Sequence, residues 1–136
     1  MTLAFALAVA DRSEEAVRQA ETAMRLNPYG PWYYPQFAGY AYYMAKRFDA
    51  AAAAFERARQ LNSRTPLPIR WSAAAYTQLG RMEKTRAARE AHMKRRPGYS
   101  IRGWMKQTKM KGAFKKLYLE GLRKAGFPEN PPEKPD

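Results

Sequence analysis

The chain has 136 residues, enough for one domain that buries roughly two-thirds of its unfolded surface. Apolar residues make up 46% of it, which argues against global disorder. Because there is no cysteine, disulfides, thiolate metal sites and a cysteine nucleophile are excluded. We therefore expect one folded domain in a reducing, cytoplasmic setting.

Positive charge is concentrated in the second part of the chain. The formal net charge is +13. Residues 1–80 carry nine Lys/Arg against six Asp/Glu, whereas residues 81–136 carry sixteen against six. A basic half of this kind is attracted to nucleic acid, to an anionic membrane surface or to an acidic protein. A solvated helical surface with a lysine-rich tail is the simpler interpretation.

Residues 1–10 are apolar but differ from a signal peptide, because no basic residues precede them. A membrane-spanning helix needs about 20 apolar residues, so this stretch is too short. We expect it to form a helix over 2–10 that completes a repeat. Counting back from Ala16 then places Met1 inside a helix, and we expect the chain to be the tail of a longer protein.

Helix-breaking residues in the sequence set the ends of the next expected helices. Prolines between the helices break the chain, because proline cannot continue a helix. Gly80 suits a helix C-terminus, where a left-handed conformation is favoured. The expected helices after the first are 13–26, 32–45, 48–61, 67–79 and 82–95.

Two further helices are expected after residue 97. Ser100 can cap a short helix that ends at Gln107. The segment 111–125 has one apolar stripe and a basic opposite side. We expect it to form a cap on the open end of the last repeat, with binding to an anionic membrane as the alternative. The proline-rich segment 128–136 is predicted to be disordered.

Small and apolar residues recur every 34 or 35 positions. Ala16 and Ala23 are matched 35 residues later by Ala51 and Ala58, and a weaker copy follows that includes His92. A period of about 34 residues with two helices per unit is typical of a helical solenoid.

The spacing of Gly39, Tyr42, Ala51, Phe55 and Ala58 resembles the tetratricopeptide repeat. The resemblance implies an all-α fold, a right-handed superhelical solenoid of antiparallel helix pairs with a C-terminal capping helix. The implied units are 1–28 (truncated), 29–63 and 64–97, which make up the repeat region 1–97, followed by a helical cap over 98–127.

Two sequence segments carry a narrower resemblance, Arg25-Leu26-Asn27-Pro28-Tyr29 and Glu120-Gly121-Leu122-Arg123-Lys124-Ala125-Gly126. They are similar to the C-terminal repeat region of multidomain bacterial class III adenylate/guanylate cyclases. Nothing in this chain matches the catalytic domain of those proteins. The resemblance therefore implies a regulatory or scaffolding tail in bacterial signalling.

The sequence offers little support for catalysis. His92 is the one histidine, and it occupies a helix position that normally packs against a neighbour. There is no glycine-rich phosphate loop and no converging pair of carboxylates. We expect a non-enzyme without cofactor or metal.

The repeat geometry predicts a concave groove lined by the first helix of each unit. Tyrosines there suit recognition of a peptide or a helix, although they can equally serve only in packing. The lysine and asparagine set with which some family members hold a terminal carboxylate is absent, but Arg70 can hold an acidic side chain. The predicted groove residues are Tyr33, Gln36, Tyr40, Tyr43, Arg70 and Gln78.

Two functions follow from these features. The first is a protein–protein interaction module that binds a peptide, a partner domain or its own upstream domain, with self-association through the exposed first helix as a further option. The second is nucleic-acid or acidic-partner binding through the basic half, with Trp104 as a stacking group. The predicted basic patch consists of Lys94, Arg95, Arg96, Lys106, Lys109, Lys111, Lys115 and Lys116.

Overall fold

A computed structural model describes residues 12–133, which contain seven α-helices and no strand. The predicted all-α class is therefore confirmed. Each predicted helix in this range begins and ends within one residue of its expected position. The predicted helix 2–10 lies outside the described residues. The helices are α2 (Ser13–Leu26), α3 (Tyr33–Met44), α4 (Phe48–Leu61), α5 (Leu67–Gln78), α6 (Met82–Arg95), α7 (Ile101–Gln107) and α8 (Gly112–Ala125).

Local chemistry explains several of these boundaries. Ser100 Oγ accepts a hydrogen bond of 3.0 Å from the backbone N–H of Gly103, which caps α7 as expected. Gly80 follows α5 with φ +75°, and Gly126 follows α8 with φ +88°. Both are in the left-handed region that glycine tolerates best.

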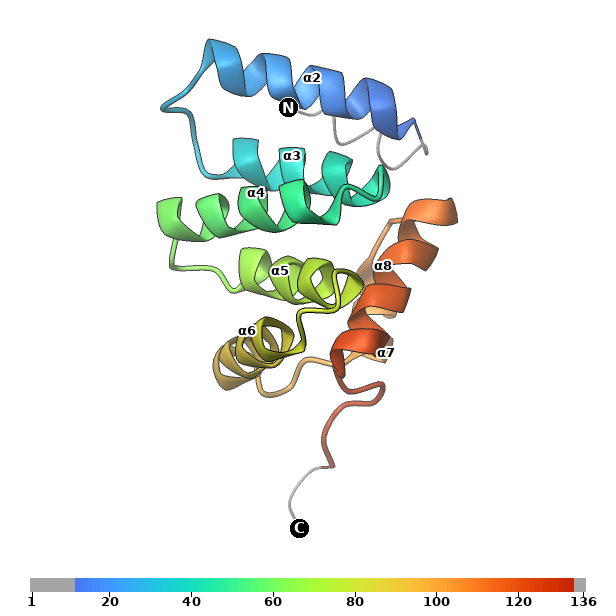
Figure 1. Cartoon of the computed structure of the whole chain (residues 1–136). Helices are drawn as coiled ribbons and strands as arrows, with labels where there is room; N and C mark the ends of the chain where they lie inside the picture. Colours follow the sequence, from blue (N-terminus) through green and yellow to red (C-terminus); the bar gives the residue numbers. More distant parts are fainter. Residues whose placement is uncertain (1–11, 134–136) are drawn as a thin grey trace.

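Helices α2 to α6 lie in a row, each packed against the next one (Figure 1). Helix α8 crosses the side of this row and packs mainly against α5, with a smaller contact on α6. None of the helices within residues 12–133 has the length and apolar character needed to cross a membrane.

An aromatic cluster around Trp71 joins the row to α8. The Trp71 ring stacks on Tyr118 of α8 at a centroid distance of 3.5 Å. It also lies 4.5 Å from the ring of Tyr40 and 5.6 Å from that of Phe55, measured between centroids. One side chain of α5 therefore contacts α3, α4 and α8 together.

The position of α8 differs from the predicted cap on the open end of the last repeat. Its residues cover α5 and α3, since Tyr118 stacks on Trp71 of α5 and Leu117 accepts a hydrogen bond from Tyr43 of α3. An apolar stripe fits any apolar surface of matching width, and the aromatic side of α3 and α5 provides one.

The disorder predicted for 128–136 does not hold at its start. The carbonyl of Pro128 accepts a 2.8 Å hydrogen bond from the N–H of Ile101, and that of Glu129 accepts one of 2.9 Å from Arg102. The Glu129 carboxylate also pairs with Arg123 at 2.6 Å. The first N–H groups of α7 need acceptors, and this segment supplies them.

Close helix packing makes Gly39 a sensitive position. A Cβ atom at Gly39 would overlap the Phe55 ring. We expect Gly39→Ala to lower the free energy of unfolding by about 1–2 kcal/mol, because overpacking outweighs the gain in helix propensity. Urea unfolding followed by circular dichroism measures it. Gly98→Ala is the matched control, since open space surrounds Gly98. Equal stability of the two variants would contradict the expectation.

Candidate partner-binding groove

The structure brings four of the six predicted groove residues together beneath or beside α8. Tyr40, Tyr43, Arg70 and Gln78 all lie on α3 or α5 at the crossing with α8. Gln36 is buried in α3. Tyr33 lies apart, at the start of α3, and is 41% exposed.

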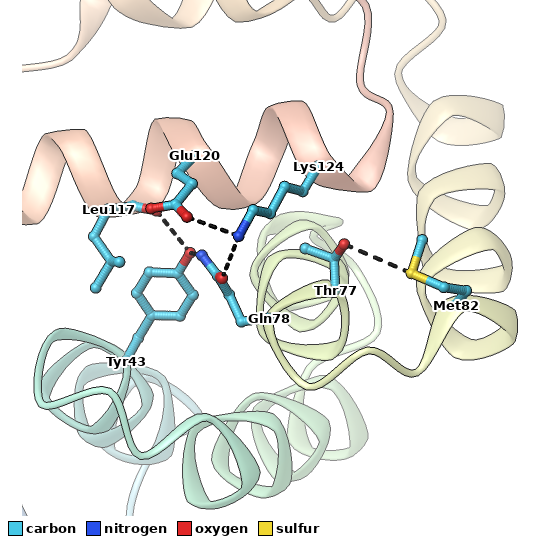
Figure 2. Close-up of polar contacts among 7 residues, drawn as sticks. All are labelled: Tyr43, Thr77, Gln78, Met82, Leu117, Glu120 and Lys124. Carbon is cyan, nitrogen blue, oxygen red and sulfur yellow. Dashed lines mark hydrogen bonds and ion pairs between the residues drawn. The ribbon is translucent and has the colours of Figure 1, made fainter.

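Tyr43 is locked into the contact with α8. Its hydroxyl donates to the carbonyl of Leu117 at 2.9 Å and accepts from Gln78 Nε2 at 3.2 Å (Figure 2). Gln78 Oε1 in turn lies 3.4 Å from Lys124 Nζ, which pairs with Glu120. Burial raises the pKa of Tyr43 well above its ordinary value. Tyr43 and Gln78 thus hold α8 in place, and the fully buried Tyr43 presents no surface to a partner.

Tyr40 is also buried, in the aromatic cluster. Its ring packs against those of Trp71 and Phe114, at centroid distances of 4.5 and 6.3 Å. Burial is the main reason why the pKa of its hydroxyl is raised. Helix α8 therefore covers this part of the predicted groove.

Arg70 is the predicted groove residue that lines three open cavities beside α8. Its Nε donates to the Tyr118 hydroxyl at 2.8 Å, and its guanidinium lies 4.9 Å from the centroid of the Tyr99 ring. It forms no ion pair with any acidic residue in the described part of the chain. Arg70 is thus an anchored, half-buried cation without a carboxylate partner.

Three cavities adjoin at Arg70, and no acidic residue lines any of them. We name them the loop cavity, the aromatic cavity and the α7 cavity, with volumes of about 480, 240 and 220 Å³ respectively. The loop cavity is lined in part by Thr65, Leu67, His92, Arg95 and Arg96. The aromatic cavity is lined in part by Tyr40, Leu67, Trp71, Trp104, Lys109 and Met110. The α7 cavity is lined in part by Tyr99, Ser100, Trp104 and Gln107.

His92 forms part of the wall of the loop cavity. It is 1% exposed and makes edge-to-face contacts with Tyr99 and Phe127. Burial, followed by the charges of Arg70, Arg96 and Arg95, lowers its pKa to about 4. The imidazole is therefore neutral near pH 7. No group of three or more metal-ligating side chains of the His, Cys, Asp or Glu type occurs within residues 12–133.

Three of the eight residues of the predicted basic patch line cavities at Arg70, and five do not. Arg95 and Arg96 line the loop cavity, and Lys109 lines the aromatic cavity. None of the eight residues pairs with an acidic side chain among the described residues. The five that line none of these three cavities are Lys94, Lys106, Lys111, Lys115 and Lys116.

Sequence reasoning missed Trp71, Tyr99 and Met110 as groove residues. Trp71 was assigned no groove position, although it lies on α5 with the predicted groove residues Arg70 and Gln78. Tyr99 and Met110 lie in connections, where no periodic pattern indicates the direction of a side chain. No protein-family model matches this chain, and no curated protein matches it either.

Proposed function

We propose that this chain is a non-catalytic protein–protein interaction module built as a tetratricopeptide-type solenoid. The 34-residue period and the row of successively packed helices support this interpretation. Within it, α8 acts as a helical cap that also fills part of the concave face. A regulatory tail of a bacterial signalling protein is the context that we propose for the module, and self-association through the first helix is compatible with it.

The proposed binding surface is the open groove formed by the three cavities. The observation that supports this proposal most directly concerns Arg70. It lines all three cavities and forms no ion pair with a carboxylate among the described residues. The stretch beneath α8 is less suited to binding, because its polar groups are already paired and its rings already packed.

The chemistry of the groove favours an acidic segment with one apolar side chain. The aromatic cavity presents the Trp71 and Trp104 rings beside Leu67 and Met110, which suits an aliphatic or aromatic anchor. Arg70 and Lys109 flank that anchor with positive charge. A carboxylate beside the anchor would meet Arg70 in a charge-assisted hydrogen bond.

Nucleic-acid or general acidic-partner binding through the basic half is the second candidate. Three exposed residues of the basic patch, Arg95, Arg96 and Lys109, lie around the same groove as the half-buried Trp104. The other five lie on α6, α7 and α8 or at its N-cap, outside the three cavities, and this favours a compact acidic ligand over a long phosphate backbone. Salt dependence separates the two candidates, since each phosphate contact adds about one unit to the log–log salt slope.

Fluorescence anisotropy with short labelled peptides tests the groove. We expect peptides with a leucine anchor and flanking glutamates to bind, and their glutamine counterparts to bind about 10–100-fold more weakly, the equivalent of about 1.5–3 kcal/mol for a charged hydrogen bond. Arg70→Gln and Lys109→Ala should each weaken binding of the glutamate peptide.

Two controls make this test decisive. Arg18→Gln removes a cation from α2, away from the groove, and should leave affinity unchanged. A labelled single-stranded oligonucleotide is the competing ligand. Equal binding of glutamate and glutamine peptides, or tight oligonucleotide binding that Arg70→Gln leaves intact, would overturn the proposal.

A further inference from the structure

The loop cavity combines size with a high density of positive charge. It lies between the start of α5 and the connection from α6 to α7, and its volume is about 480 Å³. Arg70, Arg95 and Arg96 all line it, and no carboxylate does. Three guanidinium groups around one cavity repel one another unless an anion lies between them.

Hydrogen bonds hold two of these arginines, Arg70 and Arg95, in place. Arg95 Nη2 donates to the carbonyl of Arg64 at 2.6 Å, and Arg64 precedes Thr65 of the cavity wall. Arg70 is held by the Tyr118 hydroxyl at 2.8 Å and by the Tyr99 ring. A preorganised guanidinium loses less entropy when it binds a ligand than a freely moving one.

The cavity wall also contains neutral polar groups. His92 Nδ1 and the Tyr99 hydroxyl are buried and have no hydrogen-bond partner among residues 12–133. A phenol and a neutral imidazole can each donate a hydrogen bond. Both residues line the cavity, and each has a buried polar atom without a hydrogen-bond partner among residues 12–133.

We propose that the loop cavity binds a phosphoryl group on a side chain of the partner segment, next to the apolar residue that enters the aromatic cavity. This inference rests on the proposed function and specifies the chemistry of the partner. A phosphoryl group carries about −1.5 to −2 charges and three acceptor oxygens, so it can engage all three guanidinium groups. A carboxylate has one charge and two oxygens, and it would leave at least one guanidinium without a counter-charge.

Matched peptide series test this assignment by fluorescence anisotropy. Each peptide keeps one leucine anchor and carries phosphoserine, glutamate or serine at successive positions on either side of it. We expect phosphoserine at one position to bind at least tenfold more tightly than serine there, and more tightly than glutamate. Arg95→Gln combined with Arg96→Gln should abolish this preference, so that the phosphoserine and serine peptides bind the variant with similar affinities.

The variant has a control with the same change in net charge. Arg18→Gln combined with Arg25→Gln alters α2 only, and it should retain the full preference for phosphoserine. Both substituted arginines of the loop cavity are exposed, so the test variant should fold like the wild type. Thermal unfolding of both double variants checks this.

The outcomes separate the two proposals. Binding of the glutamate peptides without any gain from phosphoserine would overturn the phosphoryl assignment and leave the proposed function standing. Failure of every peptide would overturn both. Inorganic phosphate is the third probe: shifts of the His92 and Tyr99 NMR signals with phosphate, without a preference for phosphopeptides, would show a site for a free anion and overturn the assignment to a partner segment.

Discussion

Replacing Trp71 with alanine is expected to lower the free energy of unfolding by about 3–5 kcal/mol, the range for removing a large buried aromatic side chain. Trp71 is 3% exposed. Its ring contacts those of Tyr40, Tyr43 and Phe55 in the row of helices and those of Phe114 and Tyr118 in α8. The cavity left by its removal would separate α8 from α5 as well as weaken the row.

Chemical unfolding followed by circular dichroism measures this loss, with Trp32→Ala as the matched control. Trp32 precedes α3, is only half-buried and has a recorded ring contact with its neighbour Tyr33. We expect its removal to cost about 1 kcal/mol, the typical size of a single-residue effect. Equal losses for the two variants would show that the Trp71 cluster is not the centre of the fold.

The Trp71 cluster also limits how a partner can bind. Displacing α8 would expose Phe114, Tyr118 and Leu122, all of which are fully buried. Each of these side chains contributes roughly 1.5–3 kcal/mol through burial. A partner that replaced α8 would have to restore nearly all of that area, whereas the cavities beside α8 are already open. Binding next to α8 is therefore favoured over binding in its place.

The periodic pattern and the helix-breaking residues were sufficient to predict the helices within residues 12–133. Proline and glycine break hydrogen-bonded helices through local backbone geometry, so Gly80 and Gly126 mark helix ends without knowledge of the rest of the fold. Ser100 caps α7 through an equally local contact, a hydrogen bond from the backbone N–H of Gly103 three positions later. Such signals depend on neighbours in sequence, and the sequence contains them completely.

The docking position of α8 depends on residues far apart in the chain, and the sequence did not predict it. The apolar stripe containing Phe114 and Tyr118 indicated which side of α8 would be buried, but not which surface would cover it. Tyr43 and Leu117 are 74 positions apart, and Arg70 and Tyr118 are 48 apart. For this reason Tyr40 and Tyr43, which we expected to line an open groove, lie beneath α8 instead.

Acidification should destabilise this protein through His92, by up to about 3 kcal/mol between pH 6.5 and pH 4. The pKa of His92 is about 4 in the folded protein, against an ordinary value of 6.5. Between these values the unfolded chain binds a proton that the folded chain excludes, so unfolding becomes more favourable as the pH falls. The contribution to stability is fully present above pH 6.5 and is lost as the pH falls through the folded pKa.

Because the chain has one histidine, a single variant isolates this effect. The free energy of unfolding is measured against pH for the wild type and for His92→Gln, and the wild type should lose up to about 3 kcal/mol relative to the variant between pH 6.5 and pH 4, since glutamine does not titrate. Parallel curves, or an NMR titration of His92 with a midpoint near 6.5, would contradict the expectation.

The charges of Arg95 and Arg96 contribute to the low pKa of His92, so the variant that removes both should raise this pKa. A phosphoryl group bound in the loop cavity should raise it as well, because it offsets the same positive charge next to the imidazole.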